Sequence, residues 1–349
     1  MQQFAIDGRP IGPGHPTYII AEAGVNHNGN VGLAQMLIDA AVHAGADAVK
    51  FQTFTAKALA SEDAPKADYQ LKSTDPRESQ VDMLRRLEIA PQAFRTLAQY
   101  CKERSITFLS TPFDSDSVEL LVALNVPAFK VASGEITNHL LLRRIGATGR
   151  PAIISSGMST MAEVERAVRV TRDAGCPAVS LLHCLSNYPA DPAEVNLNAM
   201  HTMRDAFSVP VGFSDHTMGS EISIAAVALG ASIIEKHLTL DRNMEGPDHA
   251  ASLEPVELRS MISSIRNVEA ALGSGIKEPA ASELGTRNVA RRSLVLRRDI
   301  RKGGIISADD LDAKRPAGGI GPDLLDRVIG KMAANDMRAG SILTWSDFA

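Results

Sequence analysis

The chain has 349 residues, 44% of them hydrophobic, and a formal net charge of -5. This composition is ordinary for a globular protein with a core, and mild acidity without a dense basic stretch argues against nucleic acid as the main partner. The cysteines Cys101, Cys176 and Cys184 form no CxxC pair, which favours a reducing compartment over a disulfide framework.

The chain shows no feature of export or membrane insertion. Its first residues, MQQFAIDGRP, lack the basic and apolar regions of a signal peptide. The longest apolar-rich run, over 222–234, is too short to span a bilayer. We therefore expect a cytoplasmic protein without a membrane partner.

A hairpin is predicted at the start of the chain, over 4–11, with Asp7-Gly8 as its turn. Eight short apolar runs then follow, each ending in a polar cluster, with amphipathic segments of helical spacing between them. One such segment begins at Thr160-Met-Ala-Glu163, which fits a capping box. The eight runs are 18–21, 46–49, 106–109, 128–129, 152–154, 179–182, 209–213 and 231–234.

Alternating strands and helices imply a parallel sheet. Eight units in about 260 residues predict an α/β fold of the (β/α)8 TIM-barrel type, whose usual size is about 250 residues. A doubly wound open sheet is the alternative. No GxGxxG follows the first strand, and a count of eight favours closure.

The end of the chain has a different composition. Residues 273–287 are rich in turn-forming residues, and we interpret them as a linker between a barrel at 1–272 and a small β-rich domain at 288–349. Residues 299–311 and 336–348 repeat Asp, Arg, Gly, Ile and a late Asp in register. Two copies are too few for a solenoid, so we predict a compact, pseudo-symmetric module.

Polar residues that follow barrel strands gather at one mouth of the barrel. Lys50 and Lys130 directly follow apolar strand residues. With nearby hydroxyl groups they predict a site for phosphate or carboxylate, and lysines snorkelling from solvated loops are the alternative. The hydroxyl groups are those of Thr111, Ser133, Ser155 and Ser214.

Two histidines and a glutamate suggest the chemistry. His216 and His237 end successive strands, which are commonly neighbours, and neutral imidazole suits a divalent transition metal. Alternatively the two histidines bond separately to the backbone, or His183 replaces one of them. Burial of Glu22 would raise its pKa toward the acid-base range, unless it only braces the loop at 26–29. Together these groups suggest an aldehyde polarised for carbon-carbon bond formation or cleavage.

A series of motifs resembles one family over nearly the whole chain. In order they are IIAEAGVNHNG, VKFQTF, FLSTPFD, FKVASGE, SSGM, HCLSNYP, GFSDHT, IEKHLTLD, GPDHAAS and KRPAGGIG. Together they resemble the bacterial sialic acid synthases. The resemblance implies a (β/α)8 barrel followed by a small antifreeze-like (SAF) domain, in agreement with the pattern of strands and the duplicated tail.

The resemblance also implies a reaction. The enzyme would be a transferase that condenses phosphoenolpyruvate with open-chain N-acetylmannosamine and water, giving N-acetylneuraminate and phosphate. The alternative is N,N'-diacetyllegionaminate synthesis from 2,4-diacetamido-2,4,6-trideoxymannose, because the sequence does not place the residues that meet sugar carbons 4 and 6. A pseudaminate synthase ranks lower, since Ala23-Gly-Val25 stands where those enzymes tend to have a Leu-Ser-Ala variant.

Roles are carried over by motif. His216 and His237 would bind the divalent metal, with Mn²⁺ preferred to Mg²⁺ or Co²⁺, and Glu22 would be the acid-base group. The phosphoenolpyruvate site would comprise Lys50, Thr111, Lys130, Ser133, Ser155 and Ser214. Sugar contacts would come from Gln52, Glu135, Tyr188 and Asp248, and from Ser186 or Asn187. The family's tail domain crosses to a partner subunit, which implies a domain-swapped homodimer with Arg315 at the N-acetyl group.

Two other classes fit parts of the sequence. The tail alone would suit a carbohydrate- or ice-binding protein, although the charged Lys314-Arg315 suits ice poorly, and a thermal-hysteresis assay would detect that activity. A lyase that breaks a carbon-carbon bond through a Schiff base would use Lys50 or Lys130. Borohydride trapping with pyruvate would label such a lysine.

Overall fold

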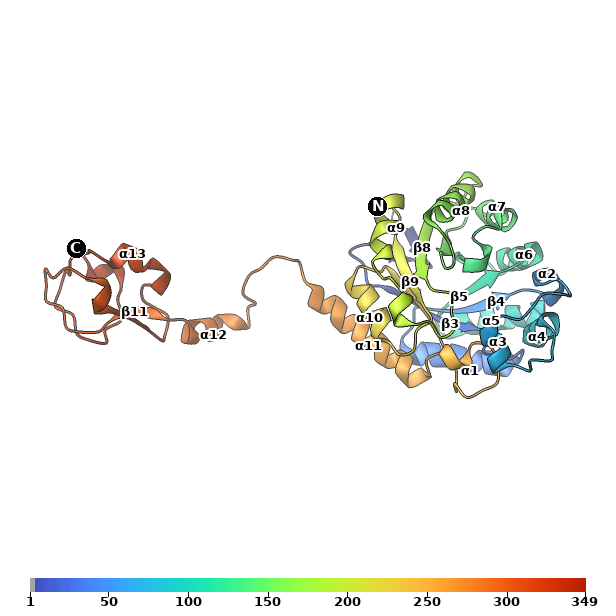
Figure 1. Cartoon of the computed structure of the whole chain (residues 1–349), viewed down its shortest axis with the longest axis horizontal. Coiled ribbons are helices and arrows are strands. Elements are labelled where there is room, and N and C mark those ends of the chain that lie inside the picture. Colours follow the sequence, from blue (N-terminus) through green and yellow to red (C-terminus); the bar gives the residue numbers. More distant parts are fainter. Residues whose placement is uncertain (1–3) are drawn as a thin grey trace. The chain divides into compact units, whose positions relative to one another are not determined.

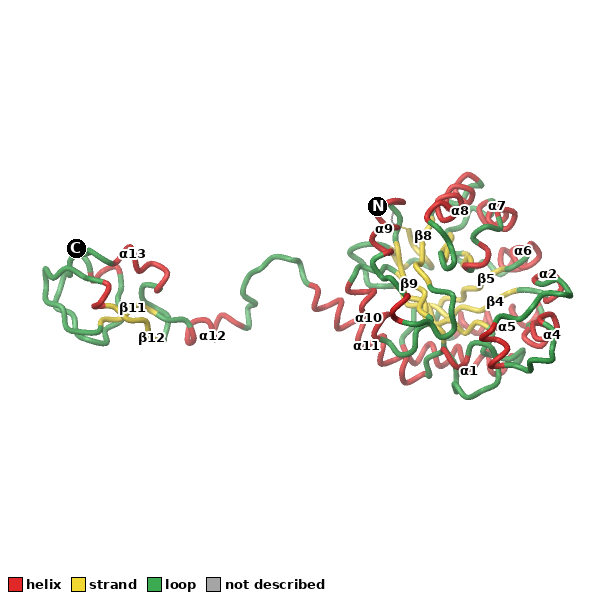
Figure 2. The backbone as a smooth tube through the Cα atoms, in the orientation of Figure 1, coloured by secondary structure: helices red, strands yellow, loops and turns green. Residues whose placement is uncertain are grey.

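The computed structural model describes residues 4–349, apart from the side chain of Lys72. The chain divides into two compact units, Met1–Gly273 and Ser274–Ala349. Figure 1 labels their helices and strands, and Figure 2 shows the strands of the first unit enclosed by helices. No helix within the described residues is long and apolar enough to cross a membrane.

Eight parallel strands form the central sheet of the first unit within residues 4–349. Neighbouring strands follow the order β5-β4-β3-β10-β9-β8-β7-β6, and β5 also contacts β6, so the sheet closes. The predicted (β/α)8 barrel is therefore confirmed. The strands are β3 (Tyr18–Gly24), β4 (Ala48–Thr53), β5 (Thr107–Pro112), β6 (Phe129–Val131), β7 (Ala152–Ser155), β8 (Val179–Cys184), β9 (Val211–Asp215) and β10 (Ile233–His237).

Helices alternate with these strands and cover the outside of the barrel (Figure 2). The capping box expected at Thr160 and Glu163 forms at the start of α8. The main helices are α1 (Val31–Ala44), α5 (Pro91–Glu103), α6 (Ser115–Ala123), α7 (His139–Gly146), α8 (Met161–Asp173), α9 (Ala199–Phe207), α10 (Glu221–Ala228) and α11 (Pro255–Leu272). Short 3₁₀ helices are η1 (Ser133–Glu135), η2 (Pro192–Glu194) and η3 (His249–Ala251).

One connection is longer than the others. Between β4 and α5, residues 54–90 contain the short helices α2 (Ala56–Leu59), α3 (Asp68–Ser73) and α4 (Gln80–Leu87). We call residues 54–90 the β4–α5 segment. Its apolar side chains form a buried cluster of their own, separate from the main core, around Phe54, Val81 and Leu84. The segment is therefore a small packed layer rather than an extended loop.

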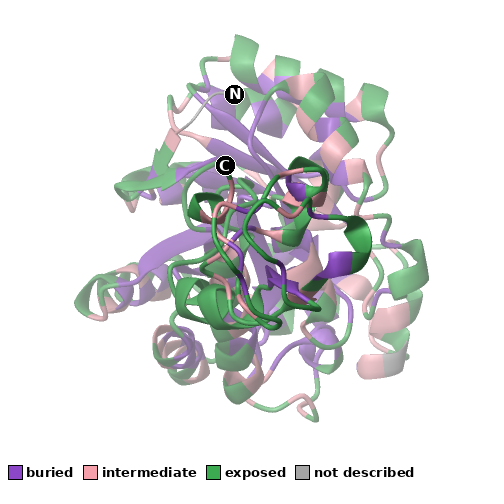
Figure 3. Ribbon diagram, turned by 90° about the vertical axis from the view of Figure 1, so that its left-hand side faces the viewer, coloured by how far each residue is buried: buried purple, intermediate pink, exposed green. Residues whose placement is uncertain are grey.

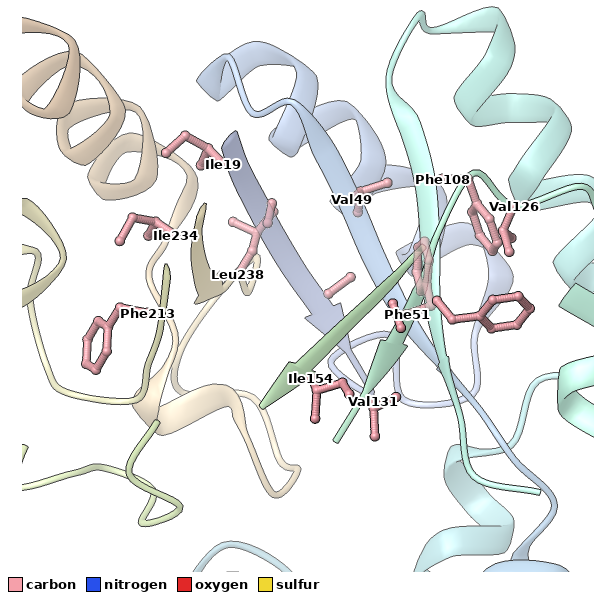
Figure 4. Close-up of a cluster of buried hydrophobic side chains, with 14 of the residues drawn as sticks. Ile19, Val49, Phe51, Phe108, Val126, Val131, Ile154, Phe213, Ile234 and Leu238 are labelled. Carbon is pink, nitrogen blue, oxygen red and sulfur yellow. The ribbon is translucent and has the colours of Figure 1, made fainter. Parts of the chain in front are cut away.

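Strand alternation divides the barrel into an outer and an inner layer. Successive strand residues face opposite sides of a sheet. Ile19, Val49 and Phe51 belong to the large cluster between strands and helices (Figure 4), and the strands are buried in Figure 3. The inner apolar layer instead comprises residues such as Ile20 and Leu109. Further along each strand the inward positions become polar, and there the candidate site lies.

The N-terminal hairpin joins the inner layer. Strands β1 (Phe4–Ile6) and β2 (Arg9–Ile11) pair antiparallel, with Asp7 and Gly8 at positive φ in the turn. Ile6 and Ile11 are fully buried in the same cluster as Ile20. The hairpin thus supplies apolar side chains to the end of the barrel interior that lies away from the polar strand ends.

The second unit contains the duplicated sequence, and the two copies bind each other reciprocally. The Lys302 backbone N–H donates to Asp336 at 2.7 Å, and the Ala339 N–H donates to Asp299 at 2.7 Å. This relation indicates a two-fold pseudo-symmetric module. Its elements are β11 (Ser293–Leu296), η4 (Ala308–Asp310), β12 (Leu311–Lys314), η5 (Pro322–Leu324), α13 (Leu325–Val328) and η6 (Trp345–Asp347). Helix α12 (Glu283–Ala290) begins within the predicted linker, so that stretch is not entirely irregular.

Candidate active site

A cavity of about 690 Å³ opens where the barrel strands end. Each of the eight strands contributes to its wall, because the inward-facing residue near each carboxyl end points into it. The contributors, in chain order, are Glu22, Lys50, Thr111, Lys130, Ser155, Cys184, Ser214 and Glu235. The β4–α5 segment supplies another part of the wall.

Most of the residues proposed from the sequence meet in this cavity. They are Glu22, Lys50, Gln52, Thr111, Lys130, Ser133, Ser155, Ser186, Tyr188, Ser214, His216, His237 and Asp248. Two others lie outside the wall: Glu135 accepts a hydrogen bond from Asn138 at 2.7 Å, and Asn187 is exposed. Arg315 belongs to the second unit, where its Nε donates to the Ala290 carbonyl at 2.9 Å. Between the two alternatives Ser186 and Asn187, the wall includes Ser186.

Two lysines and two glutamates form a buried ion network at the centre of the site. The Lys50 Nζ lies 2.7 Å from Glu22 Oε2 and 3.7 Å from Glu235 Oε2. The Lys130 Nζ lies 3.3 Å from Glu235 Oε1. Lys50 also donates to Thr111 Oγ1 at 2.9 Å. All four charged side chains are at most 5% exposed, so their charges balance within a nearly dry environment.

The two carboxyl groups of this network have opposite pKa shifts. Burial, together with the charge of Glu235, raises the pKa of Glu22 to about 7, although Lys50 opposes the change. Burial acts in the same direction on Glu235, but Lys130 and Lys50 outweigh it and lower the pKa of Glu235 to about 2. A pair of carboxyl groups separated in this way can divide two tasks. Glu235 stays ionised, and Glu22 can exchange a proton near neutral pH.

Glu235 is a functional residue that the sequence reasoning missed. It holds both lysines, and it accepts a hydrogen bond from Ser214 Oγ at 2.9 Å. The available signal was its position two residues before His237, which places both side chains on the same face of β10. Tyr69, from α3, was also missed, and its ring stacks on that of Tyr188 at 5.0 Å. No local sequence pattern links Tyr69 to the mouth of the barrel.

The two histidines fit a divalent metal. Their ring centroids lie 5.3 Å apart at the ends of the adjacent strands β9 and β10. The His216 Nδ1 bonds to the Leu185 carbonyl at 2.7 Å, which leaves the Nε2 lone pair for a ligand. The buried His237 Nδ1 has no hydrogen-bond partner within residues 4–349 and lies 3.8 Å from Asp248 Oδ2. Burial, then His216 and Lys50, hold the pKa of His237 well below its usual range, so its imidazole is neutral.

The two histidines by themselves are fewer ligands than a structural metal site has. Among the described residues, no three His, Cys, Asp or Glu side chains are placed to hold one ion together. Catalytic metal sites keep positions open for water or substrate. The two imidazoles therefore suit a catalytic rather than a structural metal.

A buried ion pair connects the strand ends that carry the histidines. The Lys236 Nζ lies 3.0 Å from Asp215 Oδ2 and donates to the Thr217 carbonyl at 2.6 Å, and both charged side chains are fully buried. Each residue directly precedes one of the histidines and so faces the opposite side of the sheet. The pair joins the ends of β9 and β10 behind the two imidazoles.

A glycine allows the hydroxyl groups of the site to come close together. The Gly157 N–H donates to Ser133 Oγ at 3.0 Å. A Cβ atom at Gly157 would lie 2.2 Å from Ser186 Oγ and 2.7 Å from Ser133 Oγ, so no larger residue fits without displacing them. The buried Ser155 Oγ has no hydrogen-bond partner among residues 4–349. The Ser155 hydroxyl lines the same cavity as Lys50 and Lys130 and can donate a hydrogen bond to an anion bound there.

Comparisons with known proteins agree with this geometry. The model of the NeuB family matches residues 37–277, and that of the SAF domain matches residues 291–349. The N,N'-diacetyllegionaminic acid synthase of Campylobacter jejuni is 48% identical over 94% of this chain and 98% of its own length. The enzyme of the same name from Legionella pneumophila is 43% identical over 97% of this chain and 96% of its own.

A solved structure is also similar. The N-acetylneuraminic acid synthetase of Leptospira borgpetersenii, in complex with citrate, superposes with a TM-score of 0.72 at 35% identity. The match covers 82% of this chain and 95% of that one. The family expected from the motifs is therefore confirmed, and with it a barrel and a SAF domain in one chain.

Proposed function

Since the chain belongs to the NeuB family of condensing synthases, we propose that it joins phosphoenolpyruvate to 2,4-diacetamido-2,4,6-trideoxymannose with addition of water, giving N,N'-diacetyllegionaminate and phosphate. The observation that carries the proposal is the buried network of Lys50, Lys130, Glu22 and Glu235 beside the adjacent histidines His216 and His237. Two relatives named for this product favour its sugar over N-acetylmannosamine, which the sequence alone had put first.

Phosphoenolpyruvate would bind at the lysines. Lys50 and Lys130 supply the positive charge, and Ser155 supplies a hydroxyl donor that has no other partner among residues 4–349. The network has no net charge when all four groups are ionised. A bound anion must therefore compete with Glu22 and Glu235 for the ammonium groups of the two lysines. A proton on Glu22 removes one of these competing charges, and the raised pKa of Glu22 makes that proton available near neutral pH.

Glu22 would serve as the acid-base group. Carbon 3 of phosphoenolpyruvate attacks the aldehyde of the sugar, water adds at carbon 2, and the tetrahedral intermediate loses phosphate. The aldehyde oxygen gains a proton and the water loses one, and a carboxyl group with a pKa of about 7 can perform both transfers. Glu235 stays ionised and keeps the two lysines in place.

His216 and His237 would hold a divalent metal, with Mn²⁺ preferred to Mg²⁺ or Co²⁺, since neutral imidazole suits such ions. When bound, the metal supplies Lewis-acid polarisation of the aldehyde oxygen. Asp248 and Tyr188 stand beside the imidazoles and would contact sugar hydroxyl groups. Gln52, whose Nε2 lies 3.4 Å from Glu22 Oε1, would do so beside the acid-base group.

We also infer a domain-swapped homodimer, in which Arg315 from a second copy reaches the N-acetyl group of the sugar. The family resemblance supports this arrangement. A complementation experiment tests it: the Glu22→Gln and Arg315→Ala variants, each inactive alone, should regain activity when unfolded and refolded together. Mixed dimers would contain one barrel with both groups intact. Two variants that stay inactive after forming dimers would show that Arg315 acts within its own chain, and an active Arg315→Ala variant would show that Arg315 has no role in the reaction.

The proposed reaction is tested by phosphate release from phosphoenolpyruvate with Mn²⁺ and either sugar. We expect kcat/KM for the diacetamido sugar to exceed that for N-acetylmannosamine by about tenfold or more, equivalent to about 1.4 kcal/mol in transition-state binding. The reverse preference would make the protein an N-acetylneuraminate synthase. No release with either sugar would contradict the proposal.

A pair of lysine variants supplies the control. Lys130→Met removes a charge from the network and should raise KM for phosphoenolpyruvate and abolish most turnover. Lys102→Met removes an exposed lysine of α5 that does not line this cavity, and should leave both unchanged. Equal effects of the two substitutions would contradict the assignment of the anion site.

A further inference from the structure

The part of the cavity wall formed by the β4–α5 segment differs in chemistry from the strand ends. The strand ends present charged groups and hydroxyls, whereas this segment presents mainly apolar side chains to the same cavity. The larger of them are Leu59, Pro65, Met83, Leu84 and Leu87, and the smaller ones are Ala60, Ala64 and Ala67. A substrate that spans the cavity would therefore meet ionic groups at its reacting end and an apolar surface elsewhere.

Four polar residues, Ser61, Tyr69, Gln70 and Gln80, also belong to this part of the wall. The Oε1 atom of Gln80 is buried and has no hydrogen-bond partner within residues 4–349, and Gln80 lines the cavity. The start of α4 does not use it, because the Ser79 side chain caps that helix by accepting from the Asp82 N–H at 3.0 Å. By contrast, the Oε1 of Gln70, on the same wall, accepts from the Ala67 N–H at 3.0 Å.

A buried amide oxygen without a partner is uncommon and unfavourable in folded proteins. A substrate that satisfies Gln80 must carry an N–H or O–H donor. It must also carry apolar groups near that donor, because the surrounding wall is mainly apolar. The two candidate sugars differ in this respect. The diacetamido sugar carries an N-acetyl group at carbon 4 and a methyl group at carbon 6, and N-acetylmannosamine carries hydroxyl groups at both carbons.

We infer that Gln80 is a specificity-determining residue whose Oε1 accepts the N–H of the acetamido group at carbon 4. The apolar side chains of the β4–α5 segment then contact the acetyl methyl and the methyl at carbon 6. An amide N–H has one fixed direction and must find its acceptor there, whereas a hydroxyl group can turn to water. N-acetylmannosamine would in addition place its carbon-6 hydroxyl against the apolar wall. This inference rests on the proposed function.

The test compares wild-type enzyme with Gln80→Met, which keeps the length of the side chain and removes its acceptor. Gln92→Met, at an exposed position of α5, is the matched control. With the diacetamido sugar, we expect Gln80→Met to lower kcat/KM by about tenfold or more. KM for phosphoenolpyruvate should stay at the wild-type value, the melting temperature should not fall, and the loss with N-acetylmannosamine should be smaller. Gln92→Met should change none of these.

The outcomes separate the inference from the proposed function. If wild-type enzyme uses the diacetamido sugar and Gln80→Met retains its kcat/KM, the inference is wrong and the function stands. The same holds if both sugars lose activity equally, or if KM for phosphoenolpyruvate rises with the loss, since Gln80 would then only shape the cavity. Wild-type enzyme that converts neither sugar would overturn the function and the inference together.

Discussion

Replacing Glu22 with glutamine keeps the size of the side chain and removes the carboxyl group that has the higher pKa of the pair Glu22 and Glu235. The pKa of this group is about 7 in the folded protein, and its ordinary value, which applies to the unfolded chain, is 4.5. Because the folded-state pKa lies above the unfolded one, the neutral carboxyl stabilises the fold fully below about pH 4.5, and this contribution is lost as the pH rises through 7. Above pH 7 the ionised group opposes folding.

The expected size of the effect follows from these two values. Each pKa unit corresponds to about 1.4 kcal/mol, so ionised Glu22 destabilises the fold by about 3 kcal/mol relative to a neutral group. Glu22→Gln should therefore raise the unfolding free energy of the barrel by about 3 kcal/mol near pH 8, and by less than about 1 kcal/mol near pH 5. Turnover should fall by a factor on the order of 10² to 10⁴, as expected for loss of an acid-base group.

Scanning calorimetry of the wild-type and Glu22→Gln proteins at both pH values measures the stability change, and phosphate release measures turnover. Asp39→Asn, on the outer helix α1, is a control for removing a carboxylate outside the cavity. A variant that melts below wild type at both pH 8 and pH 5 would refute the reasoning. Glu22 would then be ionised in the folded protein and stabilised by Lys50, with no proton to exchange near neutral pH.

Three further predictions concern the surroundings of the site. Lys236→Met leaves Asp215 as a buried unpaired charge, so it should cost about 3–5 kcal/mol in unfolding free energy and weaken Mn²⁺ binding measured by calorimetry; unchanged values of both would show that the pair does not hold the histidine-bearing strands. Gly157→Ala should push Ser133 away and raise KM for phosphoenolpyruvate without affecting folding, and a KM equal to that of wild type would contradict the close packing. A chelator should abolish turnover, and Mn²⁺ should restore it in wild-type enzyme but not in His216→Ala; turnover that survives complete metal removal would exclude a catalytic metal.

The barrel and the gathering of polar groups at one mouth could be predicted because both follow from short-range patterns. Apolar runs and amphipathic segments alternate eight times, and strand alternation sends Lys50 and Lys130 to the same side as the apolar residues two positions earlier. The adjacency of His216 and His237 follows from one crossover helix between successive strands. These rules need no knowledge of distant contacts.

The β4–α5 segment could not be predicted in this way. Its three short helices fold onto each other through their own apolar cluster, and no periodic pattern tells which of its residues face the barrel. Gln80 and Tyr69 reach the cavity because of that packing. Glu135 shows the opposite case: it follows a barrel strand, as a site residue should, and the turn of η1 places its carboxylate against Asn138.

The sequence by itself determined which residues stand at the ends of the strands and, through its motifs, the family and the class of reaction. Only the tertiary structure decided their partners. Lys50 lies between Glu22 and Glu235, whose strands flank each other in the closed sheet although 213 positions of sequence separate them. The pKa of each carboxyl group depends on its burial and on charges within about 4 Å that come from other strands. Burial raises the pKa of Glu22 although Lys50 opposes the change, whereas Lys130 and Lys50 lower the pKa of Glu235, because barrel closure sets the distances between these groups.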